Sequence, residues 1–398
     1  IAGPTAAFAT IVAGIVAKNG LDGLVIATIL AGIFLVLMGL CHFGTLIRFI
    51  PYTITTGFTA GIAVTIVIGQ LKDFFGVTYP DGVKPIETME KLHAFVENCG
   101  TVNLSAVIVG VVSLAILIIS PYIFKKIPGS LLAVVAGILM VKLLPLKAST
   151  IGDLYSISNA LPGFHLPALS LAAVEDAIPN AFTIAVLAAI ESLLSCVVAD
   201  GMINGKHRSD MELVAQGAGN IASALFGGIP ATGAIARTAA NIKNGGRTPI
   251  AGMVHSITLV LVLVVLMPYA GMIPMPTIAA ILFVVAYNMC QWRPFTHLIQ
   301  TAPKSDILVL LVTFFLTVVF DLVVAIEIGM LLTCLLFMKR MSDETHVDSW
   351  TYVDDDSDAV NDHMQKLAKE IRVYETTGPL FFGAANAIEH IVVKDFTK

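Results

Sequence analysis

Long apolar segments alternate with short polar ones over the first 340 residues. Segments that meet or approach the roughly 20 apolar residues needed to cross a bilayer fall near residues 4–18, 21–41, 52–75, 103–122, 128–146, 179–200, 210–227, 230–243, 249–270, 277–291, 305–321 and 322–338. This pattern predicts an all-α polytopic membrane protein. The first and eighth segments are short and begin at Pro4 and Pro230. Such short, proline-marked spans at matching positions are typical of a transporter's binding site.

The two short segments belong to a predicted internal repeat. Lys18-Asn19-Gly20 follows Pro4, and Lys243-Asn244-Gly245 follows Pro230. A second proline pair has nearly the same separation, because 276 − 51 = 225 and 230 − 4 = 226. Seven steps lead from the first to the eighth segment, and an odd number reverses the direction of crossing. The sequence therefore predicts a seven-plus-seven transmembrane inverted repeat, with the first two helices missing from this chain.

The segment from Gly227 to Arg237 predicts an anion site. A proline fits the first turn of a helix, and small residues after it leave backbone N–H groups open to a ligand. A helix that begins inside a membrane directs those donors and its positive dipole end at whatever lies there. The predicted donors are the hydroxyls of Thr5 and Thr232 and the backbone of Ala6, Ala7, Gly233 and Ala234. The alternative is that these small residues serve only close helix packing.

Two charged side chains of the predicted spans are candidates for function. Glu191 lies near the middle of the span 179–200, and Ser195 is one helical turn further on. A carboxylate inside a membrane can take up a proton, or bind sodium together with hydroxyl and carbonyl oxygens. Alternatively, Glu191 is paired with an arginine for packing alone. Arg237 either adds positive potential behind the anion or neutralises a buried acid, and the sequence leaves both open.

Composition and charge narrow the class further. The chain is 57% hydrophobic and 13% charged, with a net charge of −5, which argues against a nucleic-acid partner. Its five cysteines are scattered, so we predict no disulfide framework, metal site or cofactor. Since the sequence lacks a nucleophile–base pair at a recognisable spacing, we do not expect an enzyme.

Basic residues in the loops predict the orientation. If the polar C-terminal tail is cytoplasmic, alternation places eleven lysines and arginines inside and six lysines outside. The inner set is Arg48, Lys125, Lys126, Lys206, Arg208, Lys243, Arg247, Arg293, Lys304, Lys339 and Arg340, and the outer set is Lys18, Lys72, Lys84, Lys91, Lys142 and Lys147.

The composition changes to that of a soluble protein after Arg340. We predict a transmembrane transport domain over residues 1–340 and a linker over residues 341–370. Residues 371–375 alternate like a strand, a Gly-Pro turn follows, and residues 380–386 predict a second strand before a helix. Residues 371–398 therefore predict the truncated beginning of an α/β domain.

Four stretches, residues 3–7, 51–61, 191–194 and 228–241, resemble the SulP anion permeases, and residues 372–386 resemble the start of a STAS domain. The resemblance implies a uracil-permease-like fold with core and gate domains, an elevator-type mechanism and often a homodimer. It implies an anion between Thr5–Phe8 and Thr232–Arg237, and a coupling ion at Glu191 with Ser195 beside it. The substrate-binding residues so implied are Thr5, Ala6, Ala7, Phe8, Thr232, Gly233, Ala234 and Arg237.

The predicted function is secondary active transport of a small anion in a bacterial-type inner membrane. Sulfate or a dicarboxylate is the favoured substrate, and bicarbonate is next. Glutamate rather than aspartate at position 191 resembles the proton-coupled branch of the family, so proton symport is favoured. The alternatives are a sodium-coupled bicarbonate transporter, or an anion exchanger or channel of the same fold. A nucleobase permease is disfavoured because the segment 230–243 carries Arg237 and no acid.

Overall fold

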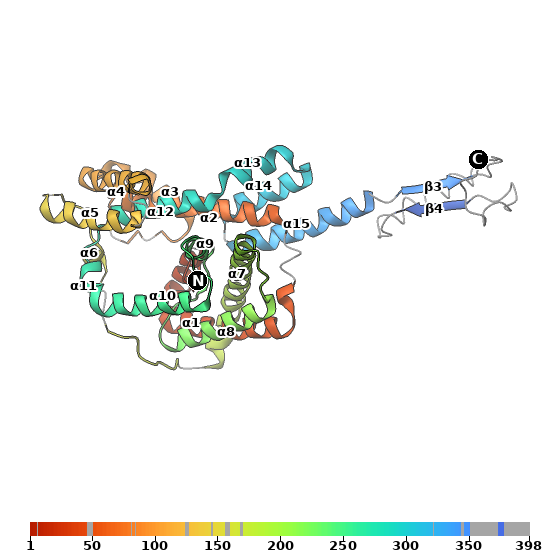
Figure 1. Cartoon of the computed structure of the whole chain (residues 1–398), viewed down its shortest axis with the longest axis horizontal. Coiled ribbons are helices and arrows are strands. Elements are labelled where there is room, and N and C mark those ends of the chain that lie inside the picture. Colours follow the sequence, from red (N-terminus) through yellow and green to blue (C-terminus); the bar gives the residue numbers. More distant parts are fainter. Residues whose placement is uncertain are drawn as a thin grey trace. The chain divides into compact units, whose positions relative to one another are not determined.

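The computed structural model divides the chain into two compact units, residues 1–327 and 328–398, and each is described by itself. The described residues are 1–5, 7–45, 51–80, 82–83, 85–123, 127–144, 146–155, 160–167, 170–320, 322–343, 346–350 and 373–377. Within them, six helices are long and apolar enough to cross a membrane (Figure 1). The predicted class, a helical polytopic membrane protein, is therefore confirmed.

One group of helices, the companion bundle, is centred on α2. Its members are α2 (Tyr52–Phe75), α4 (Leu104–Ile123), α5 (Gly129–Leu143), α12 (Met275–Cys290) and α14 (Lys304–Val319). Helix α2 packs on α12 and α14, while α4 packs on α12 and α5. Phe74 of α2 and Phe283 of α12 stack with ring centroids 4.9 Å apart, beside Ala279 and Ala280. Aromatic rings against alanines thus join the first and second halves of the sequence.

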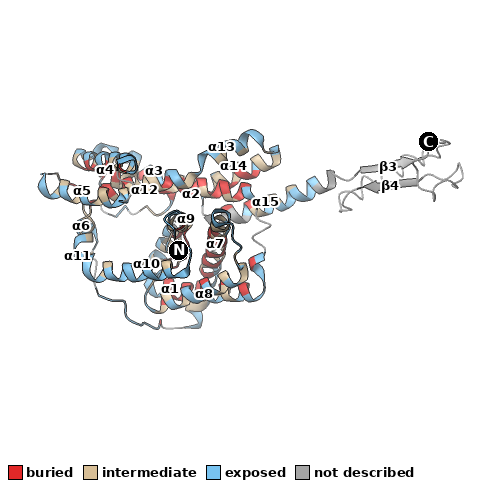
Figure 2. Ribbon diagram, in the orientation of Figure 1, coloured by how far each residue is buried: buried red, intermediate tan, exposed pale blue. Residues whose placement is uncertain are grey.

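A second group, the site bundle, is built on α7. Its members are α1 (Ala7–Leu40), α7 (Leu171–Ile203), α8 (Ser209–Leu225) and α9 (Ile235–Lys243). Helix α1 packs on α7 and α8, and α9 packs on α7. Burial is concentrated along α7, which Figure 2 shows in red. Glycines bring α1 and α8 together: a Cβ on Gly217 would lie 2.5 Å from the Gly32 carbonyl oxygen.

A break within α1 supports the internal repeat. Helix α1 covers both spans predicted at residues 4–18 and 21–41, and it is broken between them at Gly20, where φ is 71°. Gly245, at the end of the second short segment, has φ 93°. The two glycines are separated by 245 − 20 = 225 residues, the spacing of the repeat. Since L-residues with a Cβ are strained in this region, both repeats leave their short helix by the same backbone device.

The predicted starts of the two short helices are wrong. Helix α1 begins at Ala7 rather than Pro4, and α9 begins at Ile235 rather than Pro230. The segments that lead into the two helices pair as a two-stranded antiparallel sheet of β1 (Ala2–Gly3) and β2 (Thr232–Gly233). Strand β2 lies between the predicted and the observed start of α9, and its pairing keeps these residues out of the helix. Strand β1 lies before Pro4.

Other boundaries also differ from the prediction. Two amphipathic helices, α3 (Thr88–Glu97) and α13 (Trp292–Thr301), occupy segments predicted as loops. Helix α7 begins at Leu171 and accommodates Pro179, where the prediction placed its start. The span predicted at residues 249–270 is present as α10 (Pro249–Leu261), the π-helical turn η3 (Val262–Leu266) and α11 (Met267–Ala270), which together are one of the six candidate spans. The connecting elements are α6 (Ile151–Leu154) and the short 3-10 turn η2 (Cys99–Thr101). The predictions relied on apolar length, which amphipathic helices do not satisfy.

The second unit contains one described hairpin-like pair. Helix α15 (Leu322–Asp343) leads toward β3 (His346–Trp350), which pairs antiparallel with β4 (Val373–Thr377). Strand β4 overlaps the strand predicted at residues 371–375 at residues 373–375. Strand β3 falls within residues 341–370, where a linker is predicted, and the division into domains stays a prediction. The strand predicted at residues 380–386 lies outside the described residues, and the STAS domain stays a prediction.

The glycine contact between α1 and α8 gives a test of the site bundle. We expect Gly217→Val to lower the melting temperature of the purified protein, because the added side chain meets backbone that cannot yield. Gly219→Ala is the matched control, since nothing lies within 4 Å of its Cβ position on the same helix. That change should leave stability equal or raise it by about 0.5–1 kcal/mol. Equal melting temperatures for Gly217→Val and the unchanged chain would contradict the packing.

Candidate functional site

The site is organised by the β1–β2 pair, which holds the starts of the two short helices against each other. Ala2 lies opposite Gly233, and Gly3 lies opposite Thr232. The Ala234 N–H continues the pairing by donating to the Ile1 carbonyl at 3.0 Å. This N–H, which we predicted as a donor to the anion, is therefore already used. The donors that an α-helix leaves without an internal acceptor are those of its first turn, which in α9 begins at Ile235.

Glu191 is buried in α7 and meets the residue that precedes α1. Its side chain is 7% exposed, and its Oε2 accepts a hydrogen bond from the Thr5 hydroxyl at 2.8 Å. The structure thus brings together two of the predicted site residues, 186 positions apart in the sequence. Glu191 forms no ion pair with a described residue. The alternative in which an arginine neutralises Glu191 for packing therefore has no support in the described part of the chain.

The second strand rests directly on α7. A Cβ on Gly233 would lie 3.0 Å from the Ser192 Cα, so a larger residue would push the strand away from the helix. Ser195, the predicted neighbour of Glu191, donates to the Thr238 hydroxyl of α9 at 3.1 Å. Ser192 donates to Oε1 of Glu212, on α8, at 2.7 Å. The face of α7 that carries Glu191 therefore contacts β2, α8 and α9 through small polar side chains.

Arg237 ties α9 to the segment before α1. Its Nη2 donates to the Pro4 carbonyl, and a Cβ on Gly3 would lie 2.5 Å from its Nη1. Arg237 is the third residue of α9, closer to the helix start than predicted, because the helix begins late. No carboxylate of the described residues pairs with it. The guanidinium therefore adds positive charge at the place where the two short helices begin.

Thr232 has a different role from the one predicted. It is fully buried, and its hydroxyl donates to the Ala188 carbonyl of α7 at 2.9 Å. Its proton is thus committed to holding β2 against α7. Of the remaining predicted residues, Phe8 is 1% exposed, Ala7 is the first residue of α1, and Ala6 lies outside the described residues.

Two amides of α8, absent from the predicted site, fix the backbone just before β2. The Asn220 side chain, fully buried, accepts from the Ala231 N–H at 2.8 Å and donates to the Ala231 carbonyl at 2.9 Å. Gln216 donates to the same carbonyl at 2.6 Å. These side chains form hydrogen bonds with the N–H and the carbonyl of Ala231, as the backbone of a third strand would. The sequence does carry a signal for them, since two amides one turn apart stand among small residues in a predicted span.

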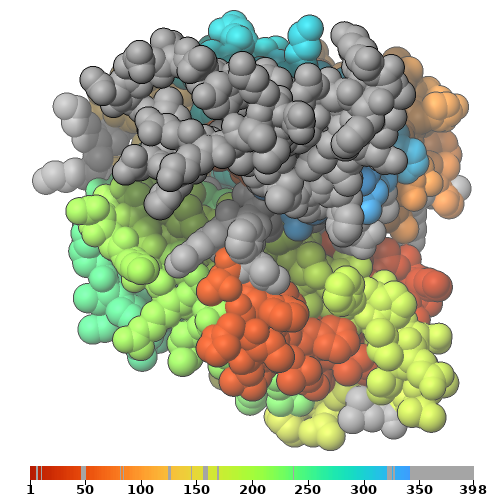
Figure 3. Space-filling model, turned by 90° about the vertical axis from the view of Figure 1, so that its right-hand side faces the viewer, coloured from red at the N-terminus to blue at the C-terminus, as the bar shows by residue number. Residues whose placement is uncertain are grey.

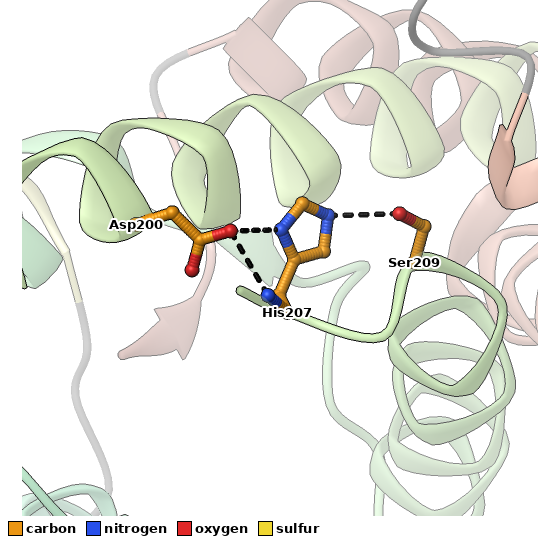
Figure 4. Close-up of polar contacts among 3 residues, drawn as sticks. All are labelled: Asp200, His207 and Ser209. Carbon is orange, nitrogen blue, oxygen red and sulfur yellow. Dashed lines mark hydrogen bonds and ion pairs between the residues drawn. The ribbon is translucent and has the colours of Figure 1, made fainter. Parts of the chain in front are cut away.

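A separate polar cluster holds the corner between α7 and α8 (Figure 4). Oδ2 of Asp200 accepts from the His207 backbone N–H at 2.9 Å and contacts its Nδ1 at 2.7 Å, while Nε2 of His207 lies 2.9 Å from the Ser209 hydroxyl. Nearby, His42 at the end of α1 pairs with Asp210 at 2.9 Å. Figure 3 shows these orange-red and yellow-green ends of α1, α7 and α8 on one surface. The cluster joins the bundle at one end and does not touch Glu191.

The described residues contain no cluster of the side chains that usually bind metal ions. Among those residues, no group of three histidine, cysteine, aspartate or glutamate side chains is placed to hold a metal ion. The Thr5 hydroxyl contacts Glu191, while the hydroxyls of Ser192 and Ser195 on the same helix donate to Glu212 and Thr238. Such a site can exchange a proton, or hold an alkali cation with backbone carbonyls.

The amide contacts to Ala231 give a direct test of how the site is held. We expect Asn220→Ala to speed hydrogen–deuterium exchange in a peptide covering residues 228–236, because a buried peptide group loses its partners. Asn98→Ala is the control, since Asn98 donates to its own helix α3 far along the chain. Exchange that stayed as slow as in the unchanged protein would show that Asn220 does not hold this segment.

Comparison with known proteins places the chain among anion transporters. A family model described as "Sulfate permease family" matches residues 1–313. The chain is 40% identical to "Putative sulfate transporter YvdB" of Bacillus subtilis (strain 168), over 100% of the chain and 74% of that protein. It is 32% identical to "Bicarbonate transporter BicA" of Picosynechococcus sp., over 94% of the chain and 67% of that protein.

The fold agrees with a solved structure as well. The transmembrane domain of a cyanobacterial bicarbonate transporter, BicA, superposes with a TM-score of 0.70 at 28% identity. The match covers 83% of each chain. The fold class expected from the spacing of the apolar segments is therefore confirmed for the transmembrane part.

Proposed function

The chain belongs to the sulfate permease family, and we propose from this premise that it is a secondary active transporter of a small anion, with sulfate or a dicarboxylate as the favoured substrate. The observation that carries the proposal is the meeting of two helix starts at the β1–β2 pair. The first turn of α9, residues 235–237, has N–H groups without an acceptor inside the helix and carries Arg237, and both features favour an anion over a cation or a neutral solute.

The coupling ion belongs on α7, at Glu191. A buried carboxylate without a positive partner is costly when charged, so it favours the uptake of a cation. A proton is the favoured cation, because Glu191 has one hydroxyl donor, from Thr5, and needs no ring of ligands to be neutralised. Thr5 contacts this acid and lies in the segment that leads into α1, which supports positions for the two ligands close enough for each to influence the other.

Sodium-coupled bicarbonate transport is the second candidate. The similarity to BicA, 32% by sequence and a TM-score of 0.70 by structure, favours it. The hydroxyls around Glu191 would serve as oxygen ligands for sodium, together with backbone carbonyls. An exchanger or channel of the same fold remains the third possibility, and lack of accumulation against a gradient would distinguish it.

The movement we propose is of the elevator type. The site bundle would act as the core domain that carries the anion, and the companion bundle as the gate domain of a homodimer. The packing supports this division, because α1, α7, α8 and α9 contact one another, while α2, α4, α5, α12 and α14 form their own set.

We propose a plasma-membrane location with a cytoplasmic C-terminus. The His42–Asp210 contact supports the alternation of the loops on which this orientation rests, since it joins the end of α1 to the α7–α8 corner, two segments that loop basicity assigned to the same side. The Asp22–His165 contact at 3.6 Å likewise joins two segments assigned to the outer side.

Uptake into proteoliposomes tests the transport function. We expect labelled sulfate to accumulate inside when an inward proton gradient is imposed, and to equilibrate only when the gradient is removed. Succinate and bicarbonate should be assayed alongside sulfate, with proton and sodium gradients applied separately. Accumulation of bicarbonate under a sodium gradient alone would select the second candidate. If no anion accumulates under either gradient, the proposal of active transport fails.

The coupling role is tested by Glu191→Gln. We expect this variant to lose gradient-driven accumulation, because a glutamine cannot bind and release the proton, while the fold is kept by its similar shape. Glu175→Gln on the same helix is the matched control, since Glu175 is exposed near the start of α7. Accumulation by Glu191→Gln equal to that of the control would remove Glu191 from the coupling mechanism.

A further inference from the structure

Thr5 occupies the junction between the two proposed ligands. It stands between β1 and α1, and its backbone carbonyl accepts from the Phe8 N–H at 3.2 Å in the first turn. Its side chain donates the hydroxyl proton to Oε2 of Glu191 on α7, with 2.8 Å between the two oxygens. The residue thus reaches the proton site with its hydroxyl while its backbone starts one of the two helices.

Which of the two side chains donates the proton in this hydrogen bond depends on the charge of Glu191. An ionised carboxylate is only an acceptor, and a hydroxyl has one proton to donate and two lone pairs to accept. While Glu191 is charged, the Thr5 proton is therefore committed to it. A protonated Glu191 has a proton of its own to donate, and Thr5 can accept it. The hydroxyl proton of Thr5 is then released by rotation about one bond, with no further proton transferred.

We propose that the Thr5 hydroxyl couples the two ligands: Glu191 holds it while the carboxylate is charged, and it turns to the anion once Glu191 has bound a proton. This inference rests on the proposed function and adds the residue through which the proton affects the anion. Thr5 acts as a positioning residue. Because binding linkage is reciprocal, anion binding strengthens proton binding at Glu191 by the same factor.

The other titratable groups on the packed elements have partners or positions of their own. On α8, Glu212 accepts from Ser192 and Asp210 pairs with His42. On α9, Arg237 donates to Pro4 and Lys243 is exposed. The remaining groups on α1 are Lys18 and the exposed Asp22, and those at the start of α7 are the exposed Glu175 and Asp176. Further along α7 are Cys196 and Asp200, and Asp200 pairs with His207. The Ile1 amine donates to Thr238. The only hydroxyl that donates to Glu191 among the described residues is that of Thr5.

Equilibrium binding of labelled sulfate to the purified chain, measured at pH 5.5 and pH 8.5, tests the inference. Sulfate keeps its charge over this range, so any change in affinity belongs to the protein. We expect the unchanged protein to bind sulfate about tenfold more tightly at the lower pH, the effect of one hydrogen bond to a charged ligand. Thr5→Val should bind weakly at both pH values, and Thr5→Ser should restore the pH dependence.

Two further variants separate the coupling role from a structural one. Glu191→Gln should bind tightly at both pH values, since its amide donates to Thr5 as the protonated acid does. Thr28→Val is the matched control, because Thr28 is a fully buried threonine of α1, the helix that Thr5 precedes, and its hydroxyl donates to the Leu24 carbonyl at 2.7 Å. It should keep the pH dependence of the unchanged protein.

The outcomes distinguish this inference from the proposed function. A pH dependence that survives in Thr5→Val, or a Thr5→Ser variant that fails to restore it, overturns the role of Thr5 alone. If Glu191→Gln binds weakly at both pH values, the release of the Thr5 hydroxyl by protonation is wrong, even should Thr5→Val fail to fold. A Glu191→Gln variant that keeps the normal pH dependence removes Glu191 from coupling, and sulfate that binds at neither pH removes sulfate as the substrate.

Discussion

The antiparallel pairing of Ala2–Gly3 with Thr232–Gly233 is the contact on which the rest of the site depends. Two chain segments that begin short helices cannot leave their backbone groups unpaired inside a bilayer, since each unsatisfied group is costly there. Pairing with each other satisfies those groups at residues 2–3 and 232–233, just ahead of the two helices. In the proposed site, the first-turn N–H groups of α9 and the Arg237 guanidinium then supply the donors for an anion.

Helix α7 supports this pairing along one face. Ala188 accepts from Thr232, Ser192 lies under Gly233, and Ser195 reaches α9 through Thr238. Glu191 stands among these contacts and reaches the segment before α1 through Thr5. Helix α7, which contacts β2 and α9, therefore also carries a buried carboxylate, to which we have assigned the coupling ion. In the proposed mechanism, a change of charge at Glu191 reaches the segment before α1 through the direct contact with Thr5.

The small residues serve both the fold and the site. Gly32 and Gly217 let α1 and α8 approach until backbone meets backbone, as is typical of membrane helices. This close contact between the helices brings Gln216 and Asn220 of α8 to the backbone of Ala231, and so fixes the residue that precedes β2. The packing interpretation of the glycines and alanines and their role in the site are thus compatible, since close packing is what exposes the backbone donors.

The sequence by itself determined the class, the apolar spans, the repeat spacing of about 225 residues and the candidate pair Glu191 and Ser195. These follow from apolar length, from proline and glycine positions and from a charge where charge is costly, all of which are local properties. Only the tertiary structure decided that Thr5 donates to Glu191, that Thr232 is committed to α7, that Ala231 is held by Asn220, and that both short helices start late. Each of these depends on a partner 11 or more residues away in the sequence, and no local pattern specifies which hydroxyl or N–H meets which acceptor across such a distance.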